Sequence, residues 1–186
     1  MISEILKKTK ENKTLIGIRI NQDDWDEILI GFIYFLDTNY IIIDEIDENA
    51  NSMGRTKIAI SQILRIDLDD RYQNRLKFIY DNRNKISSDK QITILDTSKE
   101  LLKNVDFLIK KKLICTLYFD ENQYITGIIL QKKLGHILVK NIGKQGDEEG
   151  VSCYMLDSLI GLKYNGIDEQ KITLLYKNWK LFYKDI

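Results

Sequence analysis

The chain has 186 residues, of which 44% are hydrophobic, so it is long and apolar enough for one medium domain or two small ones with packed cores. Its 28 Lys and Arg balance its 28 Asp and Glu, which excludes a strongly basic nucleic-acid coat and gives no electrostatic reason to bind an anionic membrane. Two cysteines, one histidine and no proline argue against a disulfide framework and leave too few ligands for a Cys/His zinc site.

No secretory signal peptide is expected from the N-terminal residues. Lysines soon follow Ile5 and Leu6, so the apolar core of about 7–15 residues that a signal peptide needs is missing. No stretch approaches the roughly 20 apolar residues that span a bilayer. We therefore expect a soluble, cytoplasmic protein with reduced thiols and no membrane partner.

The first half predicts a helix, five strands and a second helix. Ser3 precedes a short apolar-periodic run with lysines near its end, which is typical of a capped helix. Short isoleucine-rich runs separated by Asp, Asn and Gly predict strands. These runs are Leu15–Ile20, Ile28–Leu36, Tyr40–Ile46, Lys57–Ile60 and Ile63–Leu68. Helical spacing of Tyr72, Leu76, Ile79 and Tyr80 then predicts the closing helix.

The second half repeats this order. Ser98 precedes a helix-like run, and Ile172, Leu175, Tyr176 and Trp179 mark the last helix. The expected strands are Leu113–Phe119, Tyr124–Gln131, His136–Ile142, Val151–Leu156 and Leu159–Tyr164. We therefore expect a first repeat at residues 1–84, a linker at 85–97 and a second repeat at 98–186.

A shift of 96 positions aligns the two halves. The aligned pairs include Glu4 and Glu100, Gly31 and Gly127, Gly54 and Gly150, Tyr80 and Tyr176, and Asn82 and Asn178. One register holds across helix-like, strand-like and turn-like pieces, which indicates a duplicated unit.

Alternation along the central strands predicts how they are buried. Both alternating sets of side chains in Ile28–Leu36 are apolar, so both faces of this strand are expected to be covered. A small barrel covers one face with its own interior. The predicted fold class is therefore mainly β with flanking helices, as two tandem five-stranded barrels, each helix, five strands, helix.

The first repeat resembles the Sm-like family of small barrels. Gly31-x-Ile33-x-x-Leu36-Asp37-x-x-Tyr40 followed by Ile41–Ile43 is similar to the family's first motif, and Lys57-x-Ala59-Ile60-Ser61 is similar to the fourth strand of its bacterial RNA chaperones. The second repeat departs from this pattern, with Lys133 in place of Asp37 and Cys153 in place of Lys57. Another SH3-like barrel remains the alternative.

The resemblance implies a nucleic-acid site at the turn between strands two and three. There Tyr40 would stack on a base and Lys57 would meet a phosphate, with His136 at the position of Tyr40 in the second repeat. Single-stranded RNA or DNA binding through Arg19, Tyr40, Arg55 and Lys57 is therefore one functional hypothesis. In Sm-like rings edge strands pair between subunits, so self-association is also an expectation.

Acidic clusters favour a different function. Asp23, Asp24, Asp26 and Glu27 form one cluster, and the proposed acidic face contains Asp44, Glu45, Asp47 and Glu48. Such a surface docks basic proteins with fast, salt-sensitive association. The preferred hypothesis is a protein-interaction module, an adaptor or a small inhibitor or immunity-type protein; small-ligand binding between the repeats is a third.

Catalytic chemistry is not expected. The only histidine and its nearest cysteine are predicted on different strands, and Gly143-Lys144-Gln145-Gly146 lacks the spacing of a phosphate-binding loop. The sequence therefore predicts a non-enzymatic protein with no catalytic residues, no metal site and no cofactor.

Overall fold

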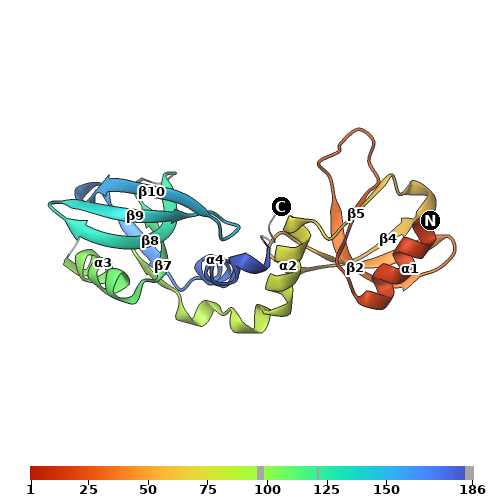
Figure 1. Cartoon of the computed structure of the whole chain (residues 1–186), viewed down its shortest axis with the longest axis horizontal. Coiled ribbons are helices and arrows are strands. Elements are labelled where there is room, and N and C mark those ends of the chain that lie inside the picture. Colours follow the sequence, from red (N-terminus) through yellow and green to blue (C-terminus); the bar gives the residue numbers. More distant parts are fainter. Residues whose placement is uncertain (96–98, 121, 183–186) are drawn as a thin grey trace. The chain divides into compact units, whose positions relative to one another are not determined.

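A computed structural model describes residues 1–95, 99–120 and 122–182 and divides the chain into two compact units, residues 1–83 and 84–186 (Figure 1). The architecture is mixed α/β rather than mainly β, with one antiparallel sheet in each unit. Ser98, the expected helix cap of the second repeat, lies outside the described residues.

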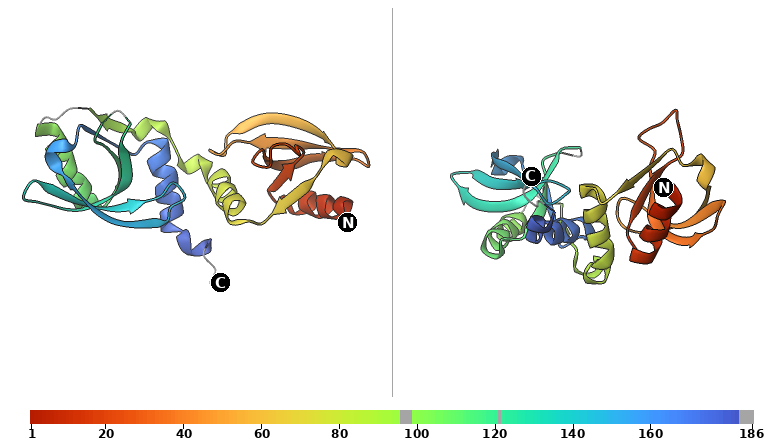
Figure 2. Two further views of the ribbon diagram at one scale, coloured as in Figure 1. Left: turned by 90° about the horizontal axis from the view of Figure 1, so that it is seen from above. Right: turned by 45° about the vertical axis from the view of Figure 1, so that its right-hand side comes forward.

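The first unit is built on a five-stranded antiparallel sheet. Its elements are α1 (Ile2–Asn12), β1 (Ile16–Arg19), β2 (Leu29–Leu36), β3 (Tyr40–Ile46), β4 (Ser52–Ala59), the 3-10 turn η1 (Ile60–Gln62), β5 (Arg65–Leu68) and α2 (Arg71–Asp81). The strand order is β4-β3-β2-β1-β5. The strands curve strongly, as Figure 2 shows.

Alternating isoleucines form the core of this unit. Ile41 and Ile43 of β3 are fully buried and pack with Ile16 and Ile18 of β1. Leu6 of α1 is also completely buried in this cluster, so the amphipathic first helix covers part of the core. The helix ends at Asn12, and the left-handed backbone of Lys13 caps it before β1.

The described part of the second unit contains six strands where five were expected. Its elements are the 3-10 turns η2 (Arg83–Lys85, which begins at the last residue of the first unit) and η3 (Ser88–Lys90), then β6 (Ile92–Ile94), α3 (Lys99–Lys111), β7 (Ile114–Tyr118), β8 (Tyr124–Lys133), β9 (His136–Ile142), β10 (Glu148–Met155), η4 (Leu156–Ser158), β11 (Gly161–Tyr164), α4 (Ile167–Lys177) and η5 (Trp179–Leu181). The strand order is β10-β9-β8-β7-β11-β6.

The extra strand comes from the segment expected to be a linker. Ile92–Ile94 pairs antiparallel with β11, so that Ile94 lies opposite Leu162. The matching strand of the first sheet, β5, is an edge strand. In the second unit β6 therefore covers the edge that β11 would otherwise expose.

From the third strand of each repeat onward, the elements of the two units have the same bounds after a shift of 96 residues. β3 and β9, β4 and β10, η1 and η4, β5 and β11, and α2 and α4 have bounds that match position by position. The same local sequence patterns thus fold in the same order in both units.

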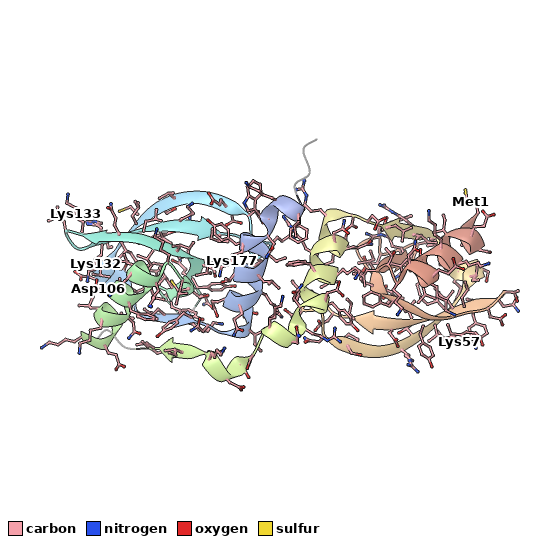
Figure 3. All side chains as sticks on the ribbon, turned by 60° about the horizontal axis from the view of Figure 1, so that its bottom comes forward. Met1, Lys57, Asp106, Lys132, Lys133 and Lys177 are labelled. Atoms are coloured by element: carbon pink, nitrogen blue, oxygen red, sulfur yellow. The ribbon has the colours of Figure 1, made fainter. Side chains whose placement is uncertain are left out.

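In the second unit, an ion pair of 2.6 Å between Asp106 and Lys132 joins α3 to β8 (Figure 3).

Closure of the sheets into barrels is not confirmed by the strand pairing. In the described part of the first unit, β4 and β5 are the two edges of the sheet and pair with β3 and β1 respectively. Among the described helices, none has the length and apolar character needed to cross a membrane.

Candidate protein-interaction sites

Cations and aromatic rings gather on the outer face of the first sheet. We call this the cation-aromatic face and define it by Tyr34, Tyr40, Arg55 and Lys57. The Arg55 guanidinium lies 3.5 Å from the centre of the Tyr34 ring, and the Lys57 ammonium lies 4.0 Å from that of Tyr40. Figure 3 shows Lys57 on this sheet. Arg55 and Lys57 share this face because they are two positions apart on β4.

Strand β2 brings its aromatic residues to this face through an irregularity. The register with β3 shifts between Ile33 and Phe35, so that Tyr34 is the extra residue. Tyr34 is 50% exposed and Phe35 39%, although the sequence predicted that both faces of this strand are covered. The Phe35 ring stacks on Tyr40, with 5.6 Å between centres.

Asp44 supplies the negative charge of the cation-aromatic face. Its Oδ1 accepts a hydrogen bond from Arg55 Nε at 2.8 Å, since the two residues are opposite each other on β3 and β4. This hydrogen bond raises the pKa of Arg55. Asp44 is therefore occupied by a cation of its own chain and does not contribute a free charge to an acidic face.

The structure does not bring the predicted acidic residues onto one surface. Glu45 is the neighbour of Asp44 on β3 and so lies on the other side of the sheet, where it accepts a hydrogen bond from Thr56 at 2.7 Å. Asp47 Oδ1 accepts the backbone N–H groups of Asn49 and Asn51, both at 2.8 Å, and closes the turn before β4. Glu48 lies in that turn, and its charge helps to raise the pKa of Tyr72, after the larger effect of burial.

Arg19 lies away from the cation-aromatic face within the first unit, and His136 belongs to the other unit. Arg19 is on β1, at the opposite side of the first sheet from β4, and is ion-paired with Asp67 at 3.3 Å. His136 belongs to the second unit, where its Nδ1 lies 2.9 Å from the carbonyl oxygen of Leu134. Of the predicted nucleic-acid residues, the structure groups Tyr40, Arg55 and Lys57 only.

The matching face of the second sheet carries different residues, two of them apolar. Leu130 and Val151 take the positions of Tyr34 and Arg55, with exposed fractions of 41% and 55%. Lys140, at the position of Asp44, is instead hydrogen-bonded to Glu148, which raises the pKa of Lys140 and lowers that of Glu148. The two repeats therefore present different chemistry on one scaffold.

An acidic loop between β1 and β2 presents a tryptophan that sequence reasoning missed. We call residues 21–27 the tryptophan loop. Trp25 in its centre is 54% exposed, and the loop's acidic side chains are Asp23, Asp24, Asp26 and Glu27. One signal for this site was present in the sequence. Trp25 is the only tryptophan among the first 178 residues, and it lies between charged residues, where a large apolar ring is not needed for solubility.

Hydrogen bonds order the tryptophan loop from within. Asp24 Oδ1 accepts the N–H groups of Asp26 at 3.0 Å and Glu27 at 3.2 Å, and Asn21 Oδ1 accepts that of Asp23 at 3.0 Å. Asn21 also donates its side-chain amide to Glu27 Oε2 at 2.9 Å, which joins the two ends of the loop. Side-chain bonds of this kind hold a turn without a regular ladder.

No family model matches the chain, and neither a curated protein nor a solved structure matches it. Among the described residues, no group of three or more His, Cys, Asp or Glu side chains is placed to hold a metal ion.

Proposed function

We propose that this chain is a non-enzymatic protein-interaction module that docks on a basic partner through the tryptophan loop. The observation that carries the proposal is Trp25, 54% exposed within four acidic side chains. Tryptophan is among the residues most enriched in the centres of protein interfaces, where it fills a pocket of the partner. The partner that fits has an apolar pocket with Lys and Arg around its rim.

The net charge of the first unit and the internal hydrogen bonds of the tryptophan loop support the same proposal. The first unit contains 12 Lys and Arg against 15 Asp and Glu, so its net charge attracts a basic protein and not a nucleic acid. The internal hydrogen bonds of the loop reduce the entropy that is lost when Trp25 is immobilised in a complex. This chemistry suits an adaptor or a small inhibitor of the immunity type.

The test is affinity purification from the native cell after nuclease treatment, followed by affinity measurement with the purified partner. Trp25→Ala is expected to weaken binding at least about tenfold, as truncation of a central anchor does. The free energy of unfolding should change by no more than about 0.5 kcal/mol, because the side chain is exposed. Met53→Ala, at a side chain 63% exposed on β4, is the matched control.

The charge of the loop is tested separately. Neutralising all four acidic residues (D23N, D24N, D26N and E27Q) should slow association and flatten its salt dependence. The control neutralises Glu4 and Glu11, two exposed residues of α1. The proposal fails if the partner binds Trp25→Ala as tightly as the wild-type chain. Light scattering on the same samples reports both the complex and any self-association.

Single-stranded nucleic acid on the cation-aromatic face is a second candidate. The pairing of Lys57 with Tyr40 favours it, because a ring beside an ammonium suits a base next to its phosphate. Fluorescence anisotropy with short labelled RNA and DNA at low salt tests this candidate. Lys57→Gln should weaken binding, and absence of any anisotropy change for the wild-type chain removes the candidate.

We also infer that each curved sheet is a small, partly open barrel of the SH3-like or Sm-like type, produced by duplication of one ancestral unit. The matching bounds of the two units and the 3-10 turn before the last strand of each repeat support this inference. A reducing compartment such as the cytoplasm suits the chain, because Cys115 and Cys153 are both free thiols.

A further inference from the structure

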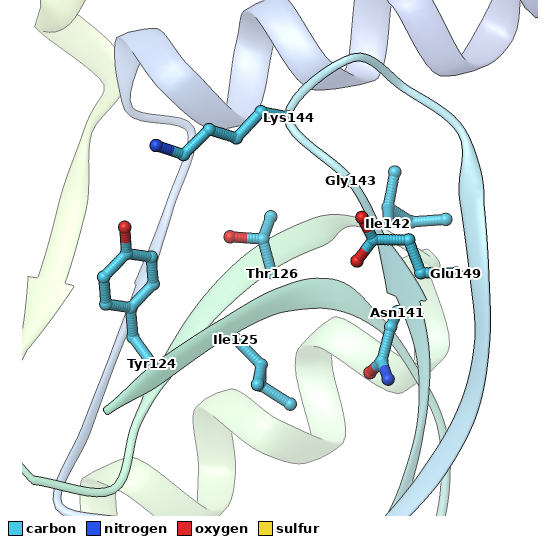
Figure 4. A pocket seen from close by; sticks show the side chains of 8 residues that line it. All are labelled: Tyr124, Ile125, Thr126, Asn141, Ile142, Gly143, Lys144 and Glu149. Carbon is cyan, nitrogen blue, oxygen red and sulfur yellow. The ribbon is translucent and has the colours of Figure 1, made fainter. Parts of the chain in front are cut away.

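The second unit contains a small pocket at the mouth of its sheet, between the beginning of β8 and the β9-β10 hairpin (Figure 4). Its volume is about 220 Å³, below the roughly 300–1,000 Å³ of pockets for drug-sized molecules. The pocket is therefore of a size for a small metabolite. Its walls are formed by Tyr124, Ile125, Thr126, Asn141, Ile142, Gly143, Lys144 and Glu149.

Opposite charges stand on different sides of the pocket. In Figure 4 the Lys144 ammonium extends across the opening on the side of the Tyr124 hydroxyl, whereas the Glu149 carboxylate lies beside Ile142 and Gly143. Neither Lys144 nor Glu149 forms an ion pair within the described residues. Both charges thus remain available to a ligand.

The Glu149 carboxylate lies against the backbone of Gly143. A Cβ on residue 143 would lie 2.6 Å from Glu149 Oε1. Glu149 is exposed, so a side chain at position 143 would displace its carboxylate from this end of the pocket, whereas glycine leaves room for it.

Asn141 adds an acceptor that has no donor. Its Nδ2 donates to Ser152 Oγ at 2.9 Å, which fixes the orientation of the amide. Its Oδ1 is shielded from solvent and finds no hydrogen-bond partner among the described residues. A shielded acceptor without a donor is unfavourable, and a ligand ammonium would satisfy it.

We propose that this pocket binds a free α-amino acid with an apolar side chain. The ligand carboxylate accepts from Lys144 and the Tyr124 hydroxyl, and its ammonium donates to Glu149 and to Asn141 Oδ1. The ligand side chain packs on the partly exposed Ile125. Opposite charges on one small molecule are needed to satisfy both sides, which is why a zwitterion fits better than a simple acid or amine.

The first unit does not repeat this set of residues. A shift of 96 positions replaces Tyr124, Lys144 and Glu149 by an isoleucine, a glutamate and a methionine. The cation and the carboxylate on which the proposal rests are therefore properties of the second unit alone.

The experiment titrates three compounds into the full chain and follows the backbone amide resonances by NMR. L-Leucine is expected to shift the resonances of Thr126, Ile142 and Gly143 with a saturable response. N-Acetyl-L-leucine lacks the ammonium and L-leucinamide lacks the carboxylate, so each should bind at least about tenfold more weakly. These two analogues also represent the C-terminus and the N-terminus of a peptide, so tight binding of either would overturn the proposal in favour of a peptide end.

Two substitutions assign the contacts. Glu149→Gln and Lys144→Gln should each weaken leucine binding at least about tenfold. Glu148→Gln is the matched control, since Glu148 is next in sequence but bonds to Lys140 and Tyr176 outside the pocket. The proposal is wrong if leucine causes no saturable shift in the wild-type chain, or if Glu149→Gln binds leucine as well as Glu148→Gln does.

Discussion

Gly31 and Gly127 lie against equivalent atoms of their own sheets. A Cβ on Gly31 would overlap the backbone carbonyl of Asp44, and one on Gly127 would overlap that of Lys140. Asp44 and Lys140 are themselves matched by the shift of 96 residues. The long second strand of each repeat therefore passes so close to the third that only glycine fits, and the sheet bends there.

Substitution of either glycine is expected to destabilise its own unit. Gly31→Ala and Gly127→Ala should each lower the free energy of unfolding by about 3 kcal/mol, because the added Cβ overlaps a backbone carbonyl and not the end of a flexible side chain. Urea denaturation with a probe in each unit measures the effect. Gly54→Ala is the control: its added Cβ meets nothing, and the positive φ of 104° alone should cost about 1–2 kcal/mol. Equal costs at Gly31 and Gly54 would contradict the steric explanation.

A buried carboxylate ties α4 to the second sheet. Glu169 is 1% exposed and accepts a hydrogen bond from Thr116 Oγ1, while Lys163 Nζ lies 3.4 Å away. Burial lowers the pKa of Lys163, but Glu169 and other acidic groups outweigh burial, so the pKa is raised overall. The matching residue of the first unit is Gln73, also 1% exposed, whose amide donates to the Asp67 carbonyl at 2.9 Å.

Removal of the Thr116 hydroxyl should therefore lower the stability of the second unit. Thr116→Val is expected to lower the free energy of unfolding by about 1.5–3 kcal/mol, since the buried carboxylate of Glu169 loses a donor. In Glu169→Gln the same substitution should cost about 1 kcal/mol less, because no buried charge is left without its partner. A double-mutant cycle by urea denaturation measures the difference. A coupling energy near zero would show that the Thr116 hydroxyl does not stabilise the carboxylate.

The central strands could be predicted because their apolar residues follow the pattern of a buried strand. Tyr40–Ile46 and His136–Ile142 were expected and observed with identical bounds, since alternating apolar residues face the core. Strand β4 was expected at Lys57–Ile60 but begins at Ser52. Its first half is polar and exposed at the edge of the sheet, so no apolar pattern marks where it begins.

The sites were less predictable because they depend on pairing across strands. The sequence shows Asp44 and Arg55 as members of two separate charge groups, and only the β3-β4 register makes them partners. The same limitation applies to the pocket of the second unit, whose walls come from two hairpins. Trp25 needed no long-range pairing and could have been singled out from its neighbours alone.

The stability of the second unit should fall in alkaline solution because of Cys115. Its thiol is fully buried, and burial, reinforced by the charge of Glu169, raises its pKa far above the ordinary value. The stability that depends on the neutral thiol is complete below the unfolded pKa of about 8.5 and is lost as pH rises, because the unfolded chain then binds fewer protons than the native one. The free energy of unfolding is expected to decrease by up to about 1.4 kcal/mol per pH unit above that value. Cys115→Ala should remove this part of the slope, whereas Cys153→Ala, at an exposed position, should retain it. Equal slopes for the two variants between about pH 8.5 and 10.5 would show that Cys115 does not control the alkaline loss.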